Sequence, residues 1–207
     1  MYLTKIEMKL SDAAVRSALK DAQKMHRLVS GFFQMQRKEA EILYRCRERD
    51  LFVDLYMYSA SPVDPDRVLP GMRLVAQRDV TSWIESMQDG DVFQFQLVTF
   101  PFRKVAETGA KNSRRRALRT QEERIAWLNR KAEQGGFQIL SAEESPAEKL
   151  TAYRPDEVGG RLTVDAFCYT GLLRISDVVQ FRRTVCTGIG PEKAYGLGML
   201  MLKGSGN

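Results

Sequence analysis

The sequence predicts an α+β protein built from two tandem ferredoxin-like (RRM-like) units, each with the element order β-α-β-β-α-β. In the second half, the predicted elements follow one another as strand, helix, strand, strand, helix and strand. The first half has a similar order with a weak second helix. The strongest turn signal of the chain, Gln88-Asp89-Gly90-Asp91, lies between the halves. We therefore expect one unit in residues 1–88 and the other in residues 89–207, an argument from element order alone.

The first half opens with a β-prone strand at 2–8, followed by one helix of about five turns. Ser11 and Asp12 offer an N-cap, apolar residues recur at helical spacing as far as Val29, and Gly31 ends the helix. The remaining predicted elements of this half are a β-hairpin with strands at 41–47 and 51–58, a strand at 73–80 and a short helix at 81–87.

The second half opens with an alternating strand at 92–102. Thr120 and Glu123 form a capping box that begins a helix at 121–134, and Gly135-Gly136 ends it. The remaining predicted elements are a strand at 137–140, a long polar loop at 141–160, a strand within 161–175, a helix at 177–186 and an apolar last strand at 199–202.

The composition favours a globular, basic protein. Of 207 residues, 43% are hydrophobic, which is enough for a packed core, and the formal net charge of +6 fits an anionic partner. We expect no signal peptide and no membrane span, because no apolar run approaches about 18 residues. The three cysteines form neither a zinc signature nor a disulfide framework, and this predicts a reducing, cytoplasmic setting.

A basic insert occupies residues 103–119. Seven of these seventeen residues are basic and one is acidic. The turn formers Thr108-Gly109 and Asn112-Ser113 lie within it. The basic side chains are Arg103, Lys104, Lys111, Arg114, Arg115, Arg116 and Arg119. A β-hairpin that carries them could grip the phosphates of an anionic partner, because guanidinium groups bind phosphates bidentately. The alternative is a solvated basic loop.

A glycine-rich stretch, residues 188–198, holds four glycines and one lysine, Lys193, and precedes the last strand. Glycine loses more backbone freedom on folding than any other residue, so the stretch predicts positive φ angles or close approach of the backbone. Its amide groups could then face a phosphate. The alternative is a helix-to-strand turn with a glycine cap. Lys193 either contacts the phosphate-bearing partner or shapes the loop.

The chain has one histidine, His26, near the end of the first predicted helix and at the edge of its apolar face. Histidine is the side chain that titrates near neutral pH, so a general acid or base would be this residue. The alternative is a histidine that is merely hydrogen-bonded at the edge of the core. No clustered arrangement of side chains suggests a metal site, and we expect no metal and no cofactor.

Together these features resemble the CasE family, the Cascade-associated CRISPR RNA endoribonucleases of type I-E systems. The resemblance covers essentially the whole chain and is most specific in the glycine-rich stretch. The motifs that carry it are Met1-Tyr2-Leu3-Thr4-Lys5, His26-Arg27-Leu28-Val29, Phe32-Phe33, Arg114-Arg115-Arg116, Gln121 to Leu128, Val164 to Leu173, and Gly188-Ile189-Gly190-Pro191-Glu192-Lys193-Ala194-Tyr195-Gly196-Leu197-Gly198-Met199-Leu200.

The resemblance implies metal-independent cleavage of CRISPR precursor RNA at the 3′ base of the repeat hairpin. The ribose 2′-hydroxyl attacks the adjacent phosphate, and a 2′,3′-cyclic phosphate and a 5′-hydroxyl end result. His26 matches the family's catalytic histidine. The family then stays bound to the mature crRNA and joins the other subunits of the Cascade effector. We expect a monomer outside Cascade and no membrane partner.

The residues around His26 depart from the family pattern at two places. A lysine often lies a few residues after the histidine, where this chain has Ser30-Gly31-Phe32. Many members carry a tyrosine three residues before the histidine, where this chain has Gln23, which cannot act as an acid or base. Lys24, Arg27 and Ser30 are local candidates to assist His26, and Arg27 suits a phosphate contact better than proton transfer. Gln23 leaves open a second hypothesis, a non-catalytic Cascade subunit that binds the RNA hairpin. A generic single-strand reader is weaker, because no RNP-like aromatic pattern is present.

Overall fold

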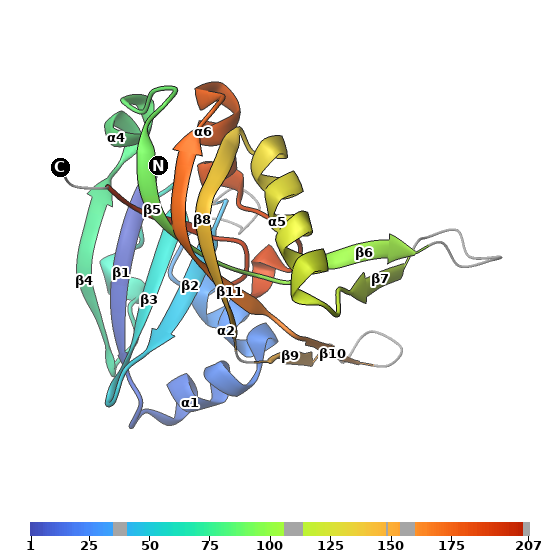
Figure 1. The fold of residues 1–207 in the computed structure, drawn as a ribbon. Coiled ribbons are helices and arrows are strands. Elements are labelled where there is room, and N and C mark those ends of the chain that lie inside the picture. Colours follow the sequence, from blue (N-terminus) through green and yellow to red (C-terminus); the bar gives the residue numbers. More distant parts are fainter. Residues whose placement is uncertain (35–40, 106–113, 148, 154–159, 205–207) are drawn as a thin grey trace.

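The computed structural model of the chain describes residues 1–34, 41–105, 114–147, 149–153 and 160–204, and it contains two four-stranded antiparallel sheets (Figure 1). The first sheet has the order β2-β3-β1-β4. Its strands are β1 (Tyr2–Lys9), β2 (Leu43–Glu48), β3 (Phe52–Ser59) and β4 (Met72–Asp79). A short 3₁₀ turn, η1 (Pro65–Arg67), stands in place of the second helix, and helix α4 (Thr81–Glu85) follows the sheet.

The second sheet has the order β12-β5-β11-β8. Its strands are β5 (Val92–Thr99), β8 (Phe137–Pro146), β11 (Phe167–Ile175) and β12 (Leu200–Gly204), and its helices are α5 (Gln121–Gln134) and α6 (Val178–Thr187). In both sheets the spatial order is fourth, first, third and second strand along the chain. The predicted pair of ferredoxin-like units is confirmed. The sheets divide the chain between β4 and β5, and the domain boundary after residue 88 stays a prediction.

The single first helix that we predicted is wrong. The chain forms two helices, α1 (Ala13–Lys20) and α2 (Ala22–Gly31), with Asp21 between them in an extended conformation, φ −142° and ψ 105°. The Asp21 carboxylate accepts a hydrogen bond from the Gln23 amide and so caps α2. It also accepts one from the amide of Tyr153, 132 residues later. Apolar spacing continues through the break, so periodicity alone did not reveal it.

The predicted loop at 141–160 is also wrong in part. Strand β8 continues to Pro146, because its polar residues still pair with β11 at one side of the sheet. Two short strands, β9 (Leu150–Tyr153) and β10 (Arg161–Val164), then form a separate hairpin near α2, so the strand predicted within 161–175 is divided between β10 and β11 (Figure 1). A solvent-facing strand edge has few apolar residues, and this is why the sequence suggested a loop.

The basic insert forms a two-stranded arm, β6 (Phe102–Val105) and β7 (Arg114–Ala117), that projects from the body of the protein (Figure 1). The strand predicted at 92–102 ends earlier, at Thr99. Pro101, which lacks a backbone N–H and cannot donate to a strand ladder, separates β5 from β6.

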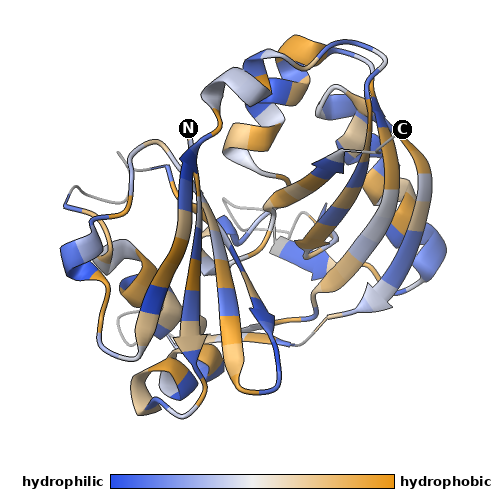
Figure 2. Ribbon diagram, turned by 90° about the vertical axis from the view of Figure 1, so that its left-hand side faces the viewer, coloured by the Kyte–Doolittle hydropathy of each residue, from blue (hydrophilic) through white to orange (hydrophobic). Residues whose placement is uncertain are grey.

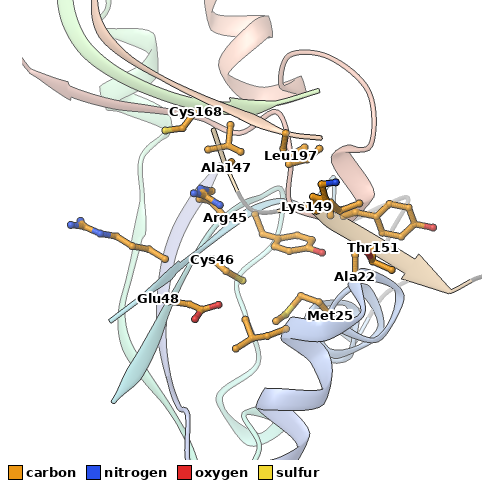
Figure 3. Close-up of a pocket in the computed structure, with 18 of the residues that line it drawn as sticks. Ala22, Met25, Arg45, Cys46, Glu48, Ala147, Lys149, Thr151, Cys168 and Leu197 are labelled. Atoms are coloured by element: carbon orange, nitrogen blue, oxygen red, sulfur yellow. The ribbon is translucent and has the colours of Figure 1, made fainter. Parts of the chain in front are cut away.

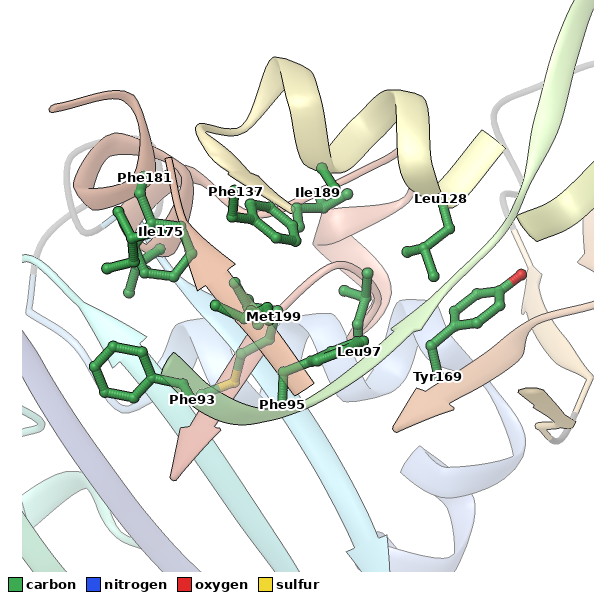
Figure 4. Packing of buried hydrophobic residues seen from close by; sticks show 14 of the residues in the cluster. Phe93, Phe95, Leu97, Leu128, Phe137, Tyr169, Ile175, Phe181, Ile189 and Met199 are labelled. Carbon is green, nitrogen blue, oxygen red and sulfur yellow. The ribbon is translucent and has the colours of Figure 1, made fainter. Parts of the chain in front are cut away.

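The largest core lies between the second sheet and helices α5 and α6 (Figure 4). Trp127, Phe137 and Phe181 are among its fully buried side chains. Leu43 and Tyr58 of the first sheet belong to the same cluster, so the two halves share buried contacts. Along the strands, hydrophobic and hydrophilic residues alternate as expected for sheets with one buried face (Figure 2). Within the described residues, no helix has the length and apolar character needed to span a membrane.

Candidate active site

His26 lies on α2 and contacts the second half of the chain. Its Nδ1 atom is 3.2 Å from the carbonyl oxygen of Ala194. A carbonyl oxygen only accepts hydrogen bonds, so we assign the proton of the neutral ring to Nδ1. Nε2 is then the basic nitrogen, which is the arrangement that a general base requires. His26 is partly exposed to solvent.

The carbonyl that orients His26 is held by a tight turn. Ala194 lies in the 3₁₀ turn η2 (Lys193–Tyr195), and the Tyr44 hydroxyl on β2 donates a second hydrogen bond to its carbonyl oxygen at 3.2 Å. Gly196 follows with φ +83°, and a Cβ atom there would lie 2.8 Å from the Tyr44 ring. Only glycine satisfies both demands, so Gly196 fixes the carbonyl against the first half of the protein.

Tyr195 is a neighbour of His26 that the sequence argument missed. Its ring meets the His26 ring edge-on, with centroids 6.1 Å apart and planes at 78°. Its hydroxyl donates a hydrogen bond to Oε1 of Gln23 at 3.0 Å. The residue is part of the most specific motif of the chain, but no local spacing relates position 195 to positions 23 and 26.

Two of the three predicted assistants of His26 are engaged elsewhere. The Lys24 ammonium donates to the Ser17 hydroxyl on α1 at 2.8 Å. The Ser30 hydroxyl donates to the backbone carbonyl of His26 at 2.7 Å, so it supports the helix and not the imidazole. Arg27 is exposed on α2, and its phosphate contact stays a prediction.

We expected the backbone amides of the glycine-rich stretch to face a phosphate, and four of them instead bind the protein itself. The amides of Ile189, Tyr195, Gly196 and Gly198 all donate to backbone carbonyls of the protein. All four glycines of the stretch have positive φ, as the sequence predicted. The same stretch therefore contains both a glycine cap on α6 and a rigid turn that faces His26.

The Lys193 ammonium donates to the Thr187 carbonyl at 2.8 Å, which closes the last turn of α6 and favours a loop-shaping role. Burial lowers the pKa of Lys193. Burial also lowers the pKa of Lys131 on α5, and the charges of Arg130, Lys104 and Lys193 lower it further. These four residues form a basic track from the arm to the glycine-rich turn. Sequence reasoning missed Arg130 and Lys131, because they look like solvated residues of a helix.

Basic residues face one another across the β6–β7 arm. Arg103 pairs with Arg116, and Lys104 pairs with Arg115. Like charges directly opposite are destabilising, so the arm is suited to an anionic partner that lies along it. Backbone pairing places Arg114 on β7, and Lys111 lies outside the described residues.

The arm contacts the glycine-rich turn and lies beside the start of α5. The Arg115 guanidinium forms a 2.8 Å ion pair with Glu192, next to the turn that orients His26. Arg103, Arg116 and Arg119 line a groove beside Arg124 at the start of α5. Arg124 is held by a bidentate pair with Glu144 at 2.7 and 2.9 Å and lies 4.0 Å above the Phe167 ring.

A cavity of about 570 Å³ lies between the halves and shares Tyr44 and Tyr195 with the His26 site (Figure 3). Arg45 and two cysteines, Cys46 and Cys168, are in its lining. Burial raises the pKa of the Cys46 thiol to about 12, so this cysteine is not a nucleophile at neutral pH. Among the residues that the structure describes, no group of three or more histidine, cysteine, aspartate or glutamate side chains could hold a metal ion.

The chain is similar to known CRISPR proteins over nearly its whole length. The chain is 28% identical over 211 aligned residues to the CRISPR-associated endoribonuclease Cse3 of Thermus thermophilus, covering 97% of this chain and 98% of the relative. The solved structure of CRISPR endoribonuclease Cse3 bound to 19 nt RNA matches with a TM-score of 0.84 and 27% identity, covering 98% of this chain and all of that chain.

A chain of a CRISPR RNA-guided surveillance complex, captured before nicking, matches with a TM-score of 0.74 and 25% identity, over 98% of this chain and 99% of that chain. These matches confirm the predicted resemblance. A family model described as CRISPR associated protein matches residues 1–203. The chain therefore belongs to this family of CRISPR associated proteins.

Proposed function

We propose that this protein is a metal-independent endoribonuclease that cleaves CRISPR precursor RNA at the 3′ base of the repeat hairpin. It stays bound to the mature crRNA and joins the other subunits of the Cascade effector. The observation that supports this most directly is the hydrogen bond between His26 Nδ1 and the Ala194 carbonyl, which leaves Nε2 as a base. Lys193, the residue before Ala194, belongs to the basic track. The relationship to Cse3 supports the RNA substrate and the surveillance complex.

In the proposed reaction, His26 Nε2 accepts the proton of the ribose 2′-hydroxyl. The 2′ oxygen attacks phosphorus, the bond to the 5′ oxygen breaks, and a 2′,3′-cyclic phosphate and a 5′-hydroxyl end result. Positioned general base catalysis contributes about 10²–10⁴-fold to such a step. Lys24 and Ser30 give the imidazole no direct support, since their polar atoms contact Ser17 and the helix backbone.

The RNA hairpin is held by the β6–β7 arm and by the basic track at its base. The contacts we assign to phosphates are those of Arg27, Arg103, Lys104, Lys111, Arg114, Arg115, Arg116, Arg119 and Lys193. Arg103 and Lys104 on β6 lie opposite Arg116 and Arg115 on β7, and Arg115 reaches the turn beside His26 through Glu192, which suits a duplex read through its backbone. The protein acts in the cytoplasm as a monomer until it joins Cascade, with one domain in residues 1–88 and the other in 89–207.

A single-turnover assay tests the function. The repeat RNA of the CRISPR array in the source organism is incubated with excess protein, with and without EDTA. We expect cleavage at one site, a cyclic phosphate on the product and no effect of EDTA. The His26→Ala variant should bind the RNA as tightly as the wild type and cleave at least about 10²-fold more slowly. Normal cleavage by that variant would overturn the mechanism.

A second function, a non-catalytic subunit that holds the RNA hairpin, is favoured by one observation. Gln23 occupies the position of the tyrosine found in many family members, and an amide cannot transfer a proton. The same assay separates the two proposals. Tight binding without cleavage by the wild type would select the binding subunit.

A further inference from the structure

The Tyr195 phenol reaches the helix face that carries His26. Its hydroxyl contacts Gln23 Oε1 at 3.0 Å, and Gln23 precedes His26 by three residues on α2. Residues three apart on a helix are neighbours on one face. The glycine-rich turn thus places the Tyr195 phenol beside the Gln23 amide of α2. The chain supplies a proton-bearing group there from its second half.

The same turn fixes the phenol and the imidazole relative to each other. Ala194 holds His26 Nδ1 through its carbonyl, and Tyr195 is the next residue. Gly196 follows with φ +83° and lies against the Tyr44 ring of β2, so the turn approaches the first half closely. Tyr195 is only partly buried, so its hydroxyl can meet a bound phosphodiester.

The chemical states of the two groups are complementary. The neutral imidazole carries its proton on Nδ1 and is basic at Nε2, whereas a phenol at neutral pH carries a proton that it can donate. Gln23 does not prevent this, because a carboxamide can turn to donate to the phenol oxygen and leave the O–H for the substrate. Among the local alternatives, Lys24 and Ser30 face other partners, and the guanidinium of Arg27 stays charged.

We propose that Tyr195 is the general acid of the cleavage reaction and that Gln23 positions it. His26 Nε2 removes the 2′ proton as the bond from the 2′ oxygen to phosphorus forms. The Tyr195 O–H gives its proton to the 5′ oxygen as the bond from phosphorus to that oxygen breaks. The imidazolium then returns its proton to the phenolate through water, so both groups regain their starting states. This assignment rests on the proposed endoribonuclease function.

The test compares two substrates with the same repeat RNA sequence, taken from the CRISPR array of the source organism. One has the natural 5′ oxygen at the scissile phosphate, and the other has sulfur there. A thiolate leaves without a proton, so the sulfur substrate does not need a general acid. We expect Tyr195→Phe to cleave the oxygen substrate about 10- to 1,000-fold more slowly than the wild type. On the sulfur substrate, its rate should be within about three-fold of the wild type.

Tyr56→Phe is the matched control. It also loses one phenol oxygen, from a β3 residue that packs under Lys5 in the first sheet, and it should cleave both substrates at the wild-type rate. Gln23→Leu provides a second variant. It removes the partner of the phenol and should give a smaller defect on the oxygen substrate that sulfur also relieves.

The outcomes separate this assignment from the function on which it rests. If the wild type cleaves, His26→Ala does not, and Tyr195→Phe cleaves the oxygen substrate normally, the assignment is overturned and the endoribonuclease stands. A Tyr195→Phe defect of equal size on both substrates also overturns the acid role, since loss of positioning would slow both. A wild type that cleaves neither substrate overturns the function itself.

Discussion

The Nδ1 atom of His26 lies 3.2 Å from the carbonyl oxygen of Ala194, and the two residues are 168 positions apart in the chain. The contact joins helix α2 of the first half to the turn η2 of the second half. It assigns the proton of the neutral imidazole to Nδ1 and so leaves Nε2 as the nitrogen that can accept a proton. The proposed cleavage therefore depends on how the two halves meet, and variants of the glycine-rich turn should affect catalysis without touching α2.

Gly196→Ala tests this dependence. The residue has φ +83°, and the new Cβ would lie 2.8 Å from the Tyr44 ring, so the turn must move. We expect the free energy of unfolding to fall by about 1–3 kcal/mol and cleavage to slow, because Ala194 and Tyr195 move away from His26. Thermal unfolding and single-turnover cleavage measure the two effects.

Gly90→Ala is the control for the turn. Gly90 also has a positive φ, +90°, but a Cβ there meets nothing within 4 Å. It should lose stability through backbone strain alone and keep the wild-type cleavage rate. Equal cleavage by Gly196→Ala and the wild type at a temperature where both are folded would contradict the proposed role of the turn.

Arg116→Ala should weaken RNA binding in a salt-dependent manner. Arg116 is exposed on β7 opposite Arg103, and we expect it to neutralise a phosphate. Loss of one such contact reduces the slope of log affinity against log salt by about one. Filter binding at several salt concentrations measures the slope. Arg78→Ala, an exposed arginine on the distant strand β4, should leave affinity and slope unchanged.

Glu192→Gln should strengthen RNA binding. Glu192 pairs with Arg115 at 2.8 Å and partly neutralises a residue that we assign to the RNA. Because a partly exposed ion pair is worth about 0.2–1 kcal/mol, we expect affinity to rise about 1.4- to 5-fold at low salt. In the Arg115→Ala background the same change should have little effect. Weaker binding by Glu192→Gln alone would show that the carboxylate supports the bound state.

The free energy of unfolding should fall at high pH because the Tyr169 phenol loses its proton. Burial raises the pKa of this phenol, and its hydrogen bond to Glu144 at 2.8 Å raises it further. A raised folded-state pKa means that the unfolded chain releases the proton first, above the usual value of about 10. The stabilisation is therefore complete below pH 10 and is lost as the pH rises through the folded pKa.

Urea unfolding of the wild type and of Tyr169→Phe at pH 8 to 11 tests this. At pH 8 the variant should be less stable by about 1 kcal/mol, because Glu144 loses a hydrogen bond. Above pH 10 its free energy of unfolding should fall less steeply than that of the wild type. Some slope should remain, because burial also raises the pKa of Tyr58, to about 12. Parallel curves would exclude Tyr169 as the titrating group.

Much of the fold followed from local patterns. The capping box at Thr120 and Glu123 and the glycines after residue 134 placed α5 at its observed bounds. Prediction failed where tertiary contacts overrode local pattern. Asp21 breaks the first helix and also receives the amide of Tyr153, and the polar part of β8 is a strand because β11 supplies its partners.

Two ferredoxin-like units, a basic arm, a glycine-rich turn and a single histidine could all be predicted from the sequence. These features can be recognised from composition, turn residues and short-range periodicity, because each depends on residues that are close in the sequence. Only the tertiary structure decided what surrounds His26. The partners of α2, the Ala194 carbonyl and the Tyr195 phenol, come from the far end of the chain, and shared burial of the two halves brings them together. Such long-range packing leaves no periodic trace in either segment.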